Sequence, residues 1–434
     1  MSARSQRTGL WGHADFLRLW AAQAISAFGS RITRTALPII AVNTLGEPEA
    51  VIAVLGALQM APAVIVAPFA GGWVDRSRKR PILIAADLFR AAVVASLTIT
   101  WIAGVLGIVQ VIAVGMLVGA ASALFQITDV AYLPFVVGRS QLAEGNAKLE
   151  TTEAIAEITG PASAGVLIWL LGAPLAVVVN VASYLWSAFM LGRIEKVETA
   201  PEPNPDAMAS TGWQSSKDMR VGMRAIFGHP QVRPIVIALM VWAVAGGFFV
   251  ALYAVLCLRT LGLPESTYGV IVAMGGIGSL AGALVSRRLA GAIGVGRTMI
   301  VTAALSTLSG LFMAVAPYAS SYTLVLVFLG AHQLLGDGFQ VAFYVQAVTL
   351  RQTVLPKHVL GRANAALLLL TIGVHIIAAL AAGTLAQLTN VRLAVWIGSV
   401  IGLAVPFCLL PLRHLRDMPA ADASSPGFAP VAHG

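Results

Sequence analysis

The strongest constraint on this chain is a short run of charge between two long apolar stretches. Residues 71–80 read Gly-Gly-Trp-Val-Asp-Arg-Ser-Arg-Lys-Arg and hold four cations and one carboxylate. The stretch 51–70 has no charged side chain, and the stretch 81–118 has only Asp87 and Arg90. A helix needs about 20 apolar residues to cross a bilayer. The pattern therefore predicts two membrane-spanning helices joined by a tight basic loop on the cytoplasmic face.

The composition excludes a soluble domain. Of the 434 residues, 58% are hydrophobic and only 11% are charged, whereas soluble domains carry about 25% charged residues. The net charge of +9 does not indicate a nucleic-acid partner, because the cations lie in loops between apolar runs. Cys257 and Cys408 fall inside apolar runs and are expected to be packed thiols. The first apolar run is too long for a cleavable signal peptide and lacks a small-residue cleavage site.

Twelve apolar runs are long enough to span a membrane, which predicts an all-α polytopic membrane protein with twelve transmembrane helices. They lie near residues 17–42, 50–72, 81–103, 107–137, 152–171, 174–192, 232–258, 265–286, 297–316, 322–350, 361–387 and 391–412. We expect a six-helix bundle over residues 1–192, a cytoplasmic linker over 193–231, a second six-helix bundle over 232–416 and a disordered tail over 417–434.

The expected linker contains an amphipathic segment from Trp213 to Phe227. Its apolar side chains include Met219, Met223 and Ile226 at helical spacing, with cations between them. This pattern is typical of a helix lying at the membrane surface.

The distribution of the cations predicts the orientation. Most of the 28 Lys and Arg residues fall in the N-terminus, the tail or the loops from even to odd runs, and the other loops are nearly bare. The positive-inside rule then places both termini in the cytoplasm of a multi-pass protein of the plasma (inner) membrane. We expect a monomer in the lipid bilayer.

The two halves carry related segments. Residues 43–48 (Asn-Thr-Leu-Gly-Glu-Pro) recur as residues 259–264 (Arg-Thr-Leu-Gly-Leu-Pro), and 145–147 (Gly-Asn-Ala) aligns with 363–365 (Ala-Asn-Ala). The offsets of 216 and 218 residues are nearly constant. Parallel six-helix repeats of this kind build many secondary transporters.

The chain has no recognisable catalytic or nucleotide-binding motif, so we expect no enzyme activity, no cofactor and no metal site. Polar side chains inside the apolar runs are the functional candidates, because an ionisable group in the bilayer is costly unless it faces a cavity or a partner. In the run 322–350, Gln333, Asp337, Gln340 and Tyr344 share one helical face. Asp337, at mid-membrane, is the first candidate for a proton-coupling carboxylate.

Two other carboxylates are further candidates for proton coupling. Asp129 shares a face of the run 107–137 with Gln126. Glu157 lies with Glu150 and Glu153 on one face near the start of the next helix, where negative charge also stabilises the helix without any function.

The remaining cavity candidates combine polar and aromatic groups. Arg34 lies on the polar face of the first run and is expected to receive an anionic group or to pair with a buried carboxylate, or else to reach the outer interface. The predicted substrate cavity comprises Arg34, Gln126, Gln333, Gln340, Tyr344, Trp242, Phe249 and His375. Such a cavity favours an amphipathic organic molecule. The alternatives are helix–helix hydrogen bonds for the two glutamines of the run 322–350, packing or lipid contact for the aromatics, and a satisfied interior histidine.

Several segments resemble the major facilitator superfamily (MFS). Gly71, Asp75, Arg76 and Arg80 match its G-x-x-x-D-R-x-x-R-R/K signature between helices 2 and 3. The resemblance implies the MFS fold of two six-helix bundles. It also implies a conformational latch in which Asp75 pairs with a nearby arginine such as Arg139.

Other segments resemble the drug/proton-antiporter branch, which includes macrolide-efflux and enterobactin-exporter-like proteins. They are Phe16-Leu17-Arg18-Leu19-Trp20, Arg34-Thr35-Ala36-Leu37-Pro38, Asp87-Leu88-Phe89-Arg90-Ala91, Leu133-Pro134 and Gly361-Arg362-Ala363-Asn364-Ala365. Asn180 departs from that branch, where an acidic residue is expected.

The segment Gly160-Pro161 with Gly165 resembles the G-P-x-x-x-G motif of MFS exporters and predicts a kink in the fifth helix. Together these features predict a secondary transporter that exports a small amphipathic molecule (a drug, siderophore or secondary metabolite) by proton-coupled alternating access. The alternatives are nutrient uptake or facilitated diffusion, and a non-transporting membrane receptor or lipid-handling protein.

Overall fold

The computed structural model describes residues 9–138, 141–196, 198 and 216–416. Within these ranges, the side chains of residues 63–64, 67–69, 71–72, 75, 216–218 and 357–358 are not described. Arg139, Trp213 and the tail 417–434, for which predictions were made, also lie outside the described residues. The described part of the chain folds into helices without a strand.

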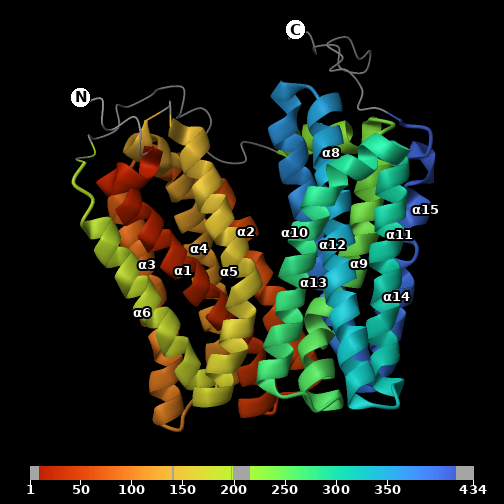
Figure 1. Ribbon diagram of the computed structural model, residues 1–434, viewed down its shortest axis with the longest axis horizontal. Coiled ribbons are helices and arrows are strands. Elements are labelled where there is room, and N and C mark those ends of the chain that lie inside the picture. The colour runs from red at the N-terminus through yellow and green to blue at the C-terminus, as the bar shows by residue number, and fades with distance from the viewer. Residues whose placement is uncertain (1–8, 139–140, 197, 199–215, 417–434) are drawn as a thin grey trace. The chain divides into compact units, whose positions relative to one another are not determined.

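The first half of the chain forms six long helices (Figure 1). They are α1 (Ala14–Ile39, continued by the π-helical turn η2, Ile40–Thr44), α2 (Glu49–Asp75), α3 (Lys79–Ile102), α4 (Ile108–Val137), α5 (Leu142–Leu171) and α6 (Ala173–Gly192). A short 3₁₀ turn, η1 (Gly9–Gly12), precedes them.

The second half begins with the short helix α8 (Ser216–Gly228). The long helices that follow are α9 (Val232–Ala254, continued by the π-helical turn η4, Val255–Thr260), α10 (Glu265–Ile293), α11 (Val295–Val315), α12 (Tyr322–Val354) and α13 (Lys357–Leu388). The last predicted run is divided into α14 (Val391–Gly402), α15 (Val405–Cys408) and the turn η6 (Leu410–Leu412). The break follows Gly402 and precedes Pro406, which cannot donate a backbone hydrogen bond inside a helix.

The prediction of an all-α polytopic membrane protein is confirmed. Ten helices in the described part are long and apolar enough to cross a membrane, and the stretch Glu49–Pro62 of α2 is a shorter apolar helix. The observed bounds follow the apolar runs closely. The main difference is α5, which begins at Leu142 instead of near residue 152, because its polar first turns continue the same helix.

The chain packs as two compact units. The first unit comprises residues up to 212 with 250–276 and 379–391, and the second comprises 213–249, 277–378 and the residues from 392 onward. The start of α10 and the end of α13 therefore belong to the first unit.

One end of the first unit is tied together by helix capping. Arg80 donates to the carbonyl oxygens of Leu191 (2.9 Å) and Gly192 at the end of α6. Glu198 accepts hydrogen bonds from the amides of Lys79 (2.7 Å) and Arg80 (3.1 Å), which begin α3. Each charge lies at the helix end whose dipole it stabilises. These caps hold the basic loop to the segment that follows α6.

Asp15, in the first turn of α1, extends this network. Its carboxylate accepts hydrogen bonds from the amides of Glu195 (2.9 Å) and Lys196 (3.1 Å) and from Arg18 (2.8 Å). Burial acts to raise the pKa of Asp15, but these hydrogen bonds outweigh it and lower the pKa below its usual range. Asp15 therefore holds the start of α1 to the chain after α6 as an ionised group.

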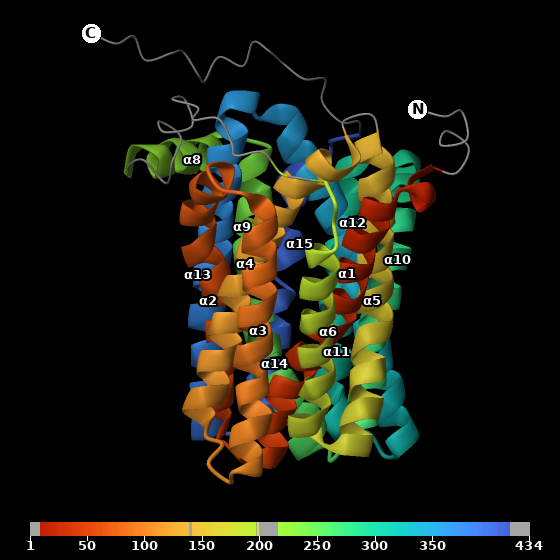
Figure 2. The ribbon, with the colours of Figure 1, turned by 90° about the vertical axis from the view of Figure 1, so that its left-hand side faces the viewer.

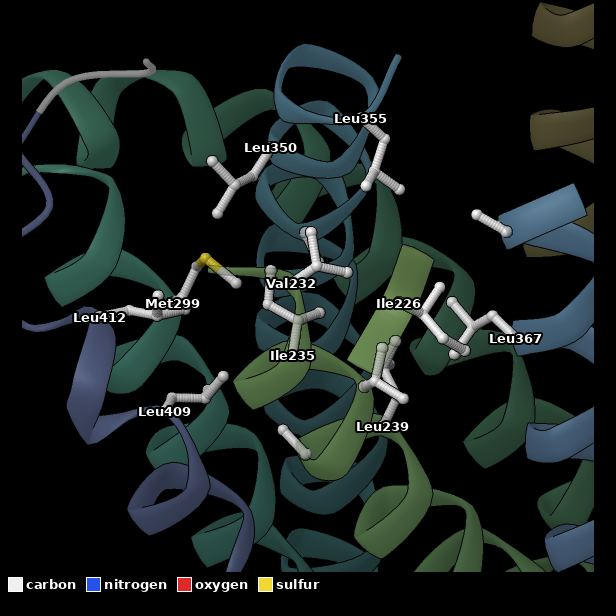
Figure 3. Close-up of a cluster of buried hydrophobic side chains, with 14 of the residues drawn as sticks. Ile226, Val232, Ile235, Leu239, Met299, Leu350, Leu355, Leu367, Leu409 and Leu412 are labelled. Carbon is white, nitrogen blue, oxygen red and sulfur yellow. The ribbon is translucent and has the colours of Figure 1, made fainter. Parts of the chain in front are cut away.

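The second unit has a large apolar core, part of which is drawn in Figure 3. Val232, Ile235 and Leu239 of α9 pack there with Met299 of α11 and Leu350 of α12. All five are nearly or completely buried. This core fixes the positions of α9, α11 and α12 within the unit.

The amphipathic helix predicted in the linker is present as α8, and part of its apolar face packs against the second unit. Ala225 and Ile226 are completely buried in the core of the second unit. A Cβ atom on Gly222 would collide with the Arg362 carbonyl group, so glycine lets α8 lie directly against α13. Figure 2 shows α8 lying across the end of α9 and α13. Protein side chains of the second unit therefore cover this part of the apolar face.

Candidate functional site

The first unit contains a cavity of about 580 Å³. Its walls are built from α1 to α6, and they include both polar and apolar groups. The charged residues in the lining are Arg31, Arg34, Arg90, Asp129, Glu150 and Glu153. Charged groups in membrane-length helices are expected to face such an internal space.

A cluster of four charges joins α1 to α5. Arg34 Nη2 lies 2.7 Å from Glu157 Oε1, and Arg31 Nη2 lies 2.5 Å from Glu157 Oε2. Arg31 also forms an ion pair with Glu153. Glu157 thus bridges two arginines. It is the carboxylate partner of Arg34 in this structure. The Arg34 side chain is 55% exposed and that of Glu157 is 44% exposed, which leaves both accessible to a ligand.

The local sequence permits this cluster. A Cβ atom on Gly160 would lie 2.6 Å from the Arg31 Cβ atom, which is too close for any side chain. Glycine at this position therefore lets the Arg31 stem lie directly against α5. Sequence reasoning named Glu157 and Arg34 but missed Arg31, although its position three residues before Arg34 places both on one helical face.

Asp129 lies on the cavity wall from α4. Its carboxylate accepts a hydrogen bond from the Gln23 side-chain amide of α1. Gln126, also predicted, lines the same cavity one turn earlier. No ion pair to Asp129 occurs within the described residues. The structure therefore places three of the predicted residues, Gln126, Asp129 and Arg34, around the cavity of the first unit.

A buried ion pair on α3 was missed as a functional candidate. The side chain of Asp87 is 0% exposed and that of Arg90 is 4% exposed, and the Arg90 guanidinium donates to the Asp87 carboxylate. Arg90 also lines the cavity. The signal was available in the sequence, since these are the only charges between residues 81 and 118.

The candidates on α12 belong to the second unit. Gln333 is buried, Asp337 and Gln340 are half-buried, and Tyr344 is exposed. Tyr344 packs edge-on against Phe343, with ring centroids 6.5 Å apart. These residues share one helix, as their spacing predicts.

The other candidates of the second unit pack against aromatic or small residues. Trp242 stacks on Phe343 at 5.2 Å, and Phe249 lies tilted against His332 at 5.6 Å. His375 approaches Gly246, and its Nε2 atom is buried without a hydrogen-bond partner. The packing alternative for the two aromatics thus has direct structural support.

The residues of the expected latch are only partly described. Gly71 and Asp75 lie in the last turns of α2, but their surroundings are outside the described residues, as is Arg139. Arg76 is exposed at the end of α2. Arg80 caps α6, as described above.

The glycine–proline segment of α5 makes close helix contacts. Pro161 lies inside α5 and is buried. A Cβ atom on Gly165 would lie 2.9 Å from the Glu265 carbonyl oxygen and 3.0 Å from Gly269 Cα, so α5 meets the start of α10 backbone to backbone. Both segments belong to the first unit.

Comparison with known proteins bears on the family. No curated protein matches the chain at a significant level. Among solved structures, a bacterial homologue of the iron transporter ferroportin in the inward-facing state has a TM-score of 0.72 at 16% identity, covering 92% of this chain and 98% of that one. The nucleoside transporter NupG has a TM-score of 0.71 at 12% identity, covering 92% and 99%. At such identities the likeness shows the fold alone.

A family model decides the assignment. The Major Facilitator Superfamily model matches residues 19–371, which is most of the chain. Its span includes the basic loop, the cavity of the first unit and the α12 stripe. The chain therefore belongs to the Major Facilitator Superfamily and is a membrane transporter.

Proposed function

We propose that this transporter exports a small amphipathic organic molecule and couples that export to proton entry. The observation that carries the proposal is the cavity of the first unit, where Asp129 meets a neutral amide on the wall of a space holding several other charges. An ionised carboxylate without a paired cation is costly inside a bilayer, so such a group can hold a proton. When ionised it changes the charge of the cavity, which is what coupling of a proton to a substrate requires.

The lining supports an amphipathic substrate. Phe125, Leu37 and Val118 supply apolar surface, and Gln59 and Ser26 supply hydrogen-bonding groups. Ligand sites of this size are typically apolar with a few convergent polar groups. The Arg34–Glu157 pair adds an accessible charge of each sign to the unit.

The export direction is supported by the resemblance of Gly160, Pro161 and Gly165 to the helix-5 motif of exporters. The proposed location is the plasma membrane, and the cation distribution supports an orientation with both termini in the cytoplasm. Asp337 is the second candidate for the coupling carboxylate and Glu157 is the third. Nutrient uptake, facilitated diffusion and a receptor function are the outcomes to exclude.

The test uses inverted membrane vesicles that contain the transporter, with ethidium and rhodamine 6G as amphipathic fluorescent probes. We expect a proton gradient, acid inside, to drive accumulation of at least one probe, and nigericin to abolish it. Asp129→Asn should remove uphill accumulation while permitting downhill exchange. Asp337→Asn is measured in the same assay. If a variant still concentrates the probe, the residue replaced in that variant is not the coupling carboxylate.

Two results would contradict the proposal. Probe flux that equilibrates but never becomes concentrated indicates a facilitative carrier. Probe binding without flux indicates a receptor.

A further inference from the structure

The Asp87–Arg90 pair is held in the interior of the first unit. The two residues lie one turn apart on α3, and the guanidinium donates to Asp87 Oδ1. Arg90 Nη1 also donates to Ser122 Oγ of α4 at 3.2 Å. A buried ion pair is weak evidence for stability, because apolar residues often replace such pairs without loss. A role beyond packing is therefore worth testing.

Aromatic rings hold the guanidinium on both sides. Arg90 Cζ lies 4.5 Å from the centroid of the Phe125 ring and 4.4 Å from that of Tyr184. Each contact is a cation–π interaction. The Tyr184 hydroxyl is 3.1 Å from Ser30 Oγ on α1. The position of one guanidinium thus affects α4 and α6 directly and α1 through Tyr184.

Asp129 lies close to this pair. Ser122, Phe125 and Asp129 share one face of α4, and Asp129 is one turn beyond Phe125. Helices α3 and α4 run in opposite directions and lie side by side (Figure 2). Asp87 precedes Arg90 by one turn, so Asp87 and Asp129 come to the same level, and their charges repel one another. Of these two carboxylates, Arg90 forms an ion pair with Asp87 in this structure.

The other charged groups that line the cavity cannot readily pair with an ionised Asp129, because they are negatively charged or already form ion pairs. Arg31 and Arg34 of α1 pair with Glu153 and Glu157 of α5. Glu150 of α5 adds a further negative charge to the lining. Tyr184 of α6 is the remaining titratable group. Among the described residues of the lining, Arg90 is thus the cation best placed to receive Asp129.

We propose that Arg90 is a positioning residue for proton coupling, shared between Asp87 and Asp129 according to whether Asp129 holds a proton. With the proton bound, Asp129 is neutral beside Gln23, and Arg90 pairs with Asp87 between the two rings. When Asp129 releases its proton to cavity water, its carboxylate attracts the guanidinium along α4. The arginine then leaves the Tyr184 ring and weakens the link to α1. The coupling role rests on the proposed function, whereas the sharing of the cation does not.

The test needs no substrate. The purified transporter in lipid is titrated from pH 4 to 10 while the protonated-carboxyl infrared band is followed, and the component missing in Asp129→Asn is assigned to Asp129. In Asp87→Asn the arginine is free to pair with Asp129, so the titration midpoint should move at least about one pH unit to the acid side, a tenfold loss of proton affinity. In Arg90→Gln the charge of Asp87 is uncompensated, so the midpoint should move to the alkaline side.

The neutral double variant Asp87→Asn/Arg90→Gln should return the midpoint close to that of the wild type, and it remains informative if Arg90→Gln fails to fold. Asp15→Asn/Arg18→Gln is the matched control, since this pair has the same spacing but lies in the first turns of α1, away from the residues that line the cavity. Single variants that leave the midpoint unchanged, or that move it in the same direction, would overturn the proposal. If the opposed shifts occur but reconstituted vesicles show no proton-driven probe flux, the cation sharing stands and the proposed function fails.

Discussion

At the scale of single residues, ion pairing decides which charges remain available to a ligand. Glu157 is bound by Arg31 and Arg34 at once, whereas Glu153 is bound by Arg31 alone. Removing the negative charge of Glu157 would leave Arg34 without its ion-pair partner. A cation in that state is costly in a membrane-length helix.

We predict that Glu157→Gln lowers the initial rate of probe transport at least tenfold, because Arg34 then reorients toward another partner. Vesicle transport assays at matched protein levels measure the effect. Glu195→Gln is the control, since Glu195 is largely exposed and pairs with Arg18 in the first turns of α1. An unchanged rate in Glu157→Gln would show that the four-charge cluster is dispensable.

At the scale of helices, close approach depends on glycine. The α5–α10 contact at Gly165 places backbone atoms where a Cβ atom would lie, and backbone cannot move as a flexible side chain can. Gly373 of α13 has nothing within 4 Å of its Cβ position. Substitution of Gly165 therefore tests helix packing, whereas substitution of Gly373 tests intrinsic helix propensity alone.

Gly165→Ala is expected to lower the stability of the protein by about 1–3 kcal/mol, the usual cost of overpacking. Gly373→Ala should be neutral or slightly stabilising, because alanine favours the helix. Thermal unfolding in detergent, followed by tryptophan fluorescence, compares the two variants. Equal melting temperatures would mean that α5 can move away from α10 at little cost.

The Asp15 network predicts how stability depends on pH at the start of α1. Since the folded pKa of Asp15 lies below its unfolded value of about 3.9, its contribution is present above that value and is lost as the pH falls through the folded pKa. Asp15→Asn should therefore lower the melting temperature at pH 7 and flatten its fall below about pH 4. Parallel acid-side curves for the variant and the wild type would argue against this role.

At the scale of the whole molecule, the repeated segments meet reciprocally within the first unit. Asn43 donates to Glu265 at 2.7 Å, and Arg259 donates to Glu49 at 3.1 Å. Each residue of one pair is offset from its counterpart by 216 residues, the spacing of the repeat. Arg259 also donates to the carbonyl oxygen of Glu47 at 2.7 Å. The segment η2 and the first residue of α2 are thus joined to the first residue of α10 and to η4 by two bonds at equivalent positions.

Arg259→Glu should lower the melting temperature by several degrees, since it replaces an attraction with a repulsion and loses the carbonyl contacts. The swap Arg259→Glu/Glu49→Arg should recover part of that loss, of the order of the 0.2–1 kcal/mol typical of accessible pairs. Double-mutant-cycle measurements of thermal unfolding give the coupling. Additive effects of the two substitutions would mean that the pair contributes nothing.

The sequence by itself determined the membrane class, the helices and their polar faces. Length and apolar run are local properties, so the expected bounds of α3, α4 and α6 agree with the structure within two residues. The polar stripe containing Gln126 and Asp129 follows from helical spacing alone. The same locality explains why the amphipathic character of α8 was visible.

Only the tertiary structure decided which of these faces meet. Arg31 finds Glu153 and Glu157 across 122 to 126 residues, and Arg90 lies between rings from α4 and α6. Hydropathy does not specify such neighbours, because helices in a membrane are selected by small-residue contacts and polar pairing, not by the exclusion of water. For the same reason, the apolar face of α8 could contact lipid or protein equally well, and only the tertiary structure shows that part of it, at Ile226, packs into the core of the second unit.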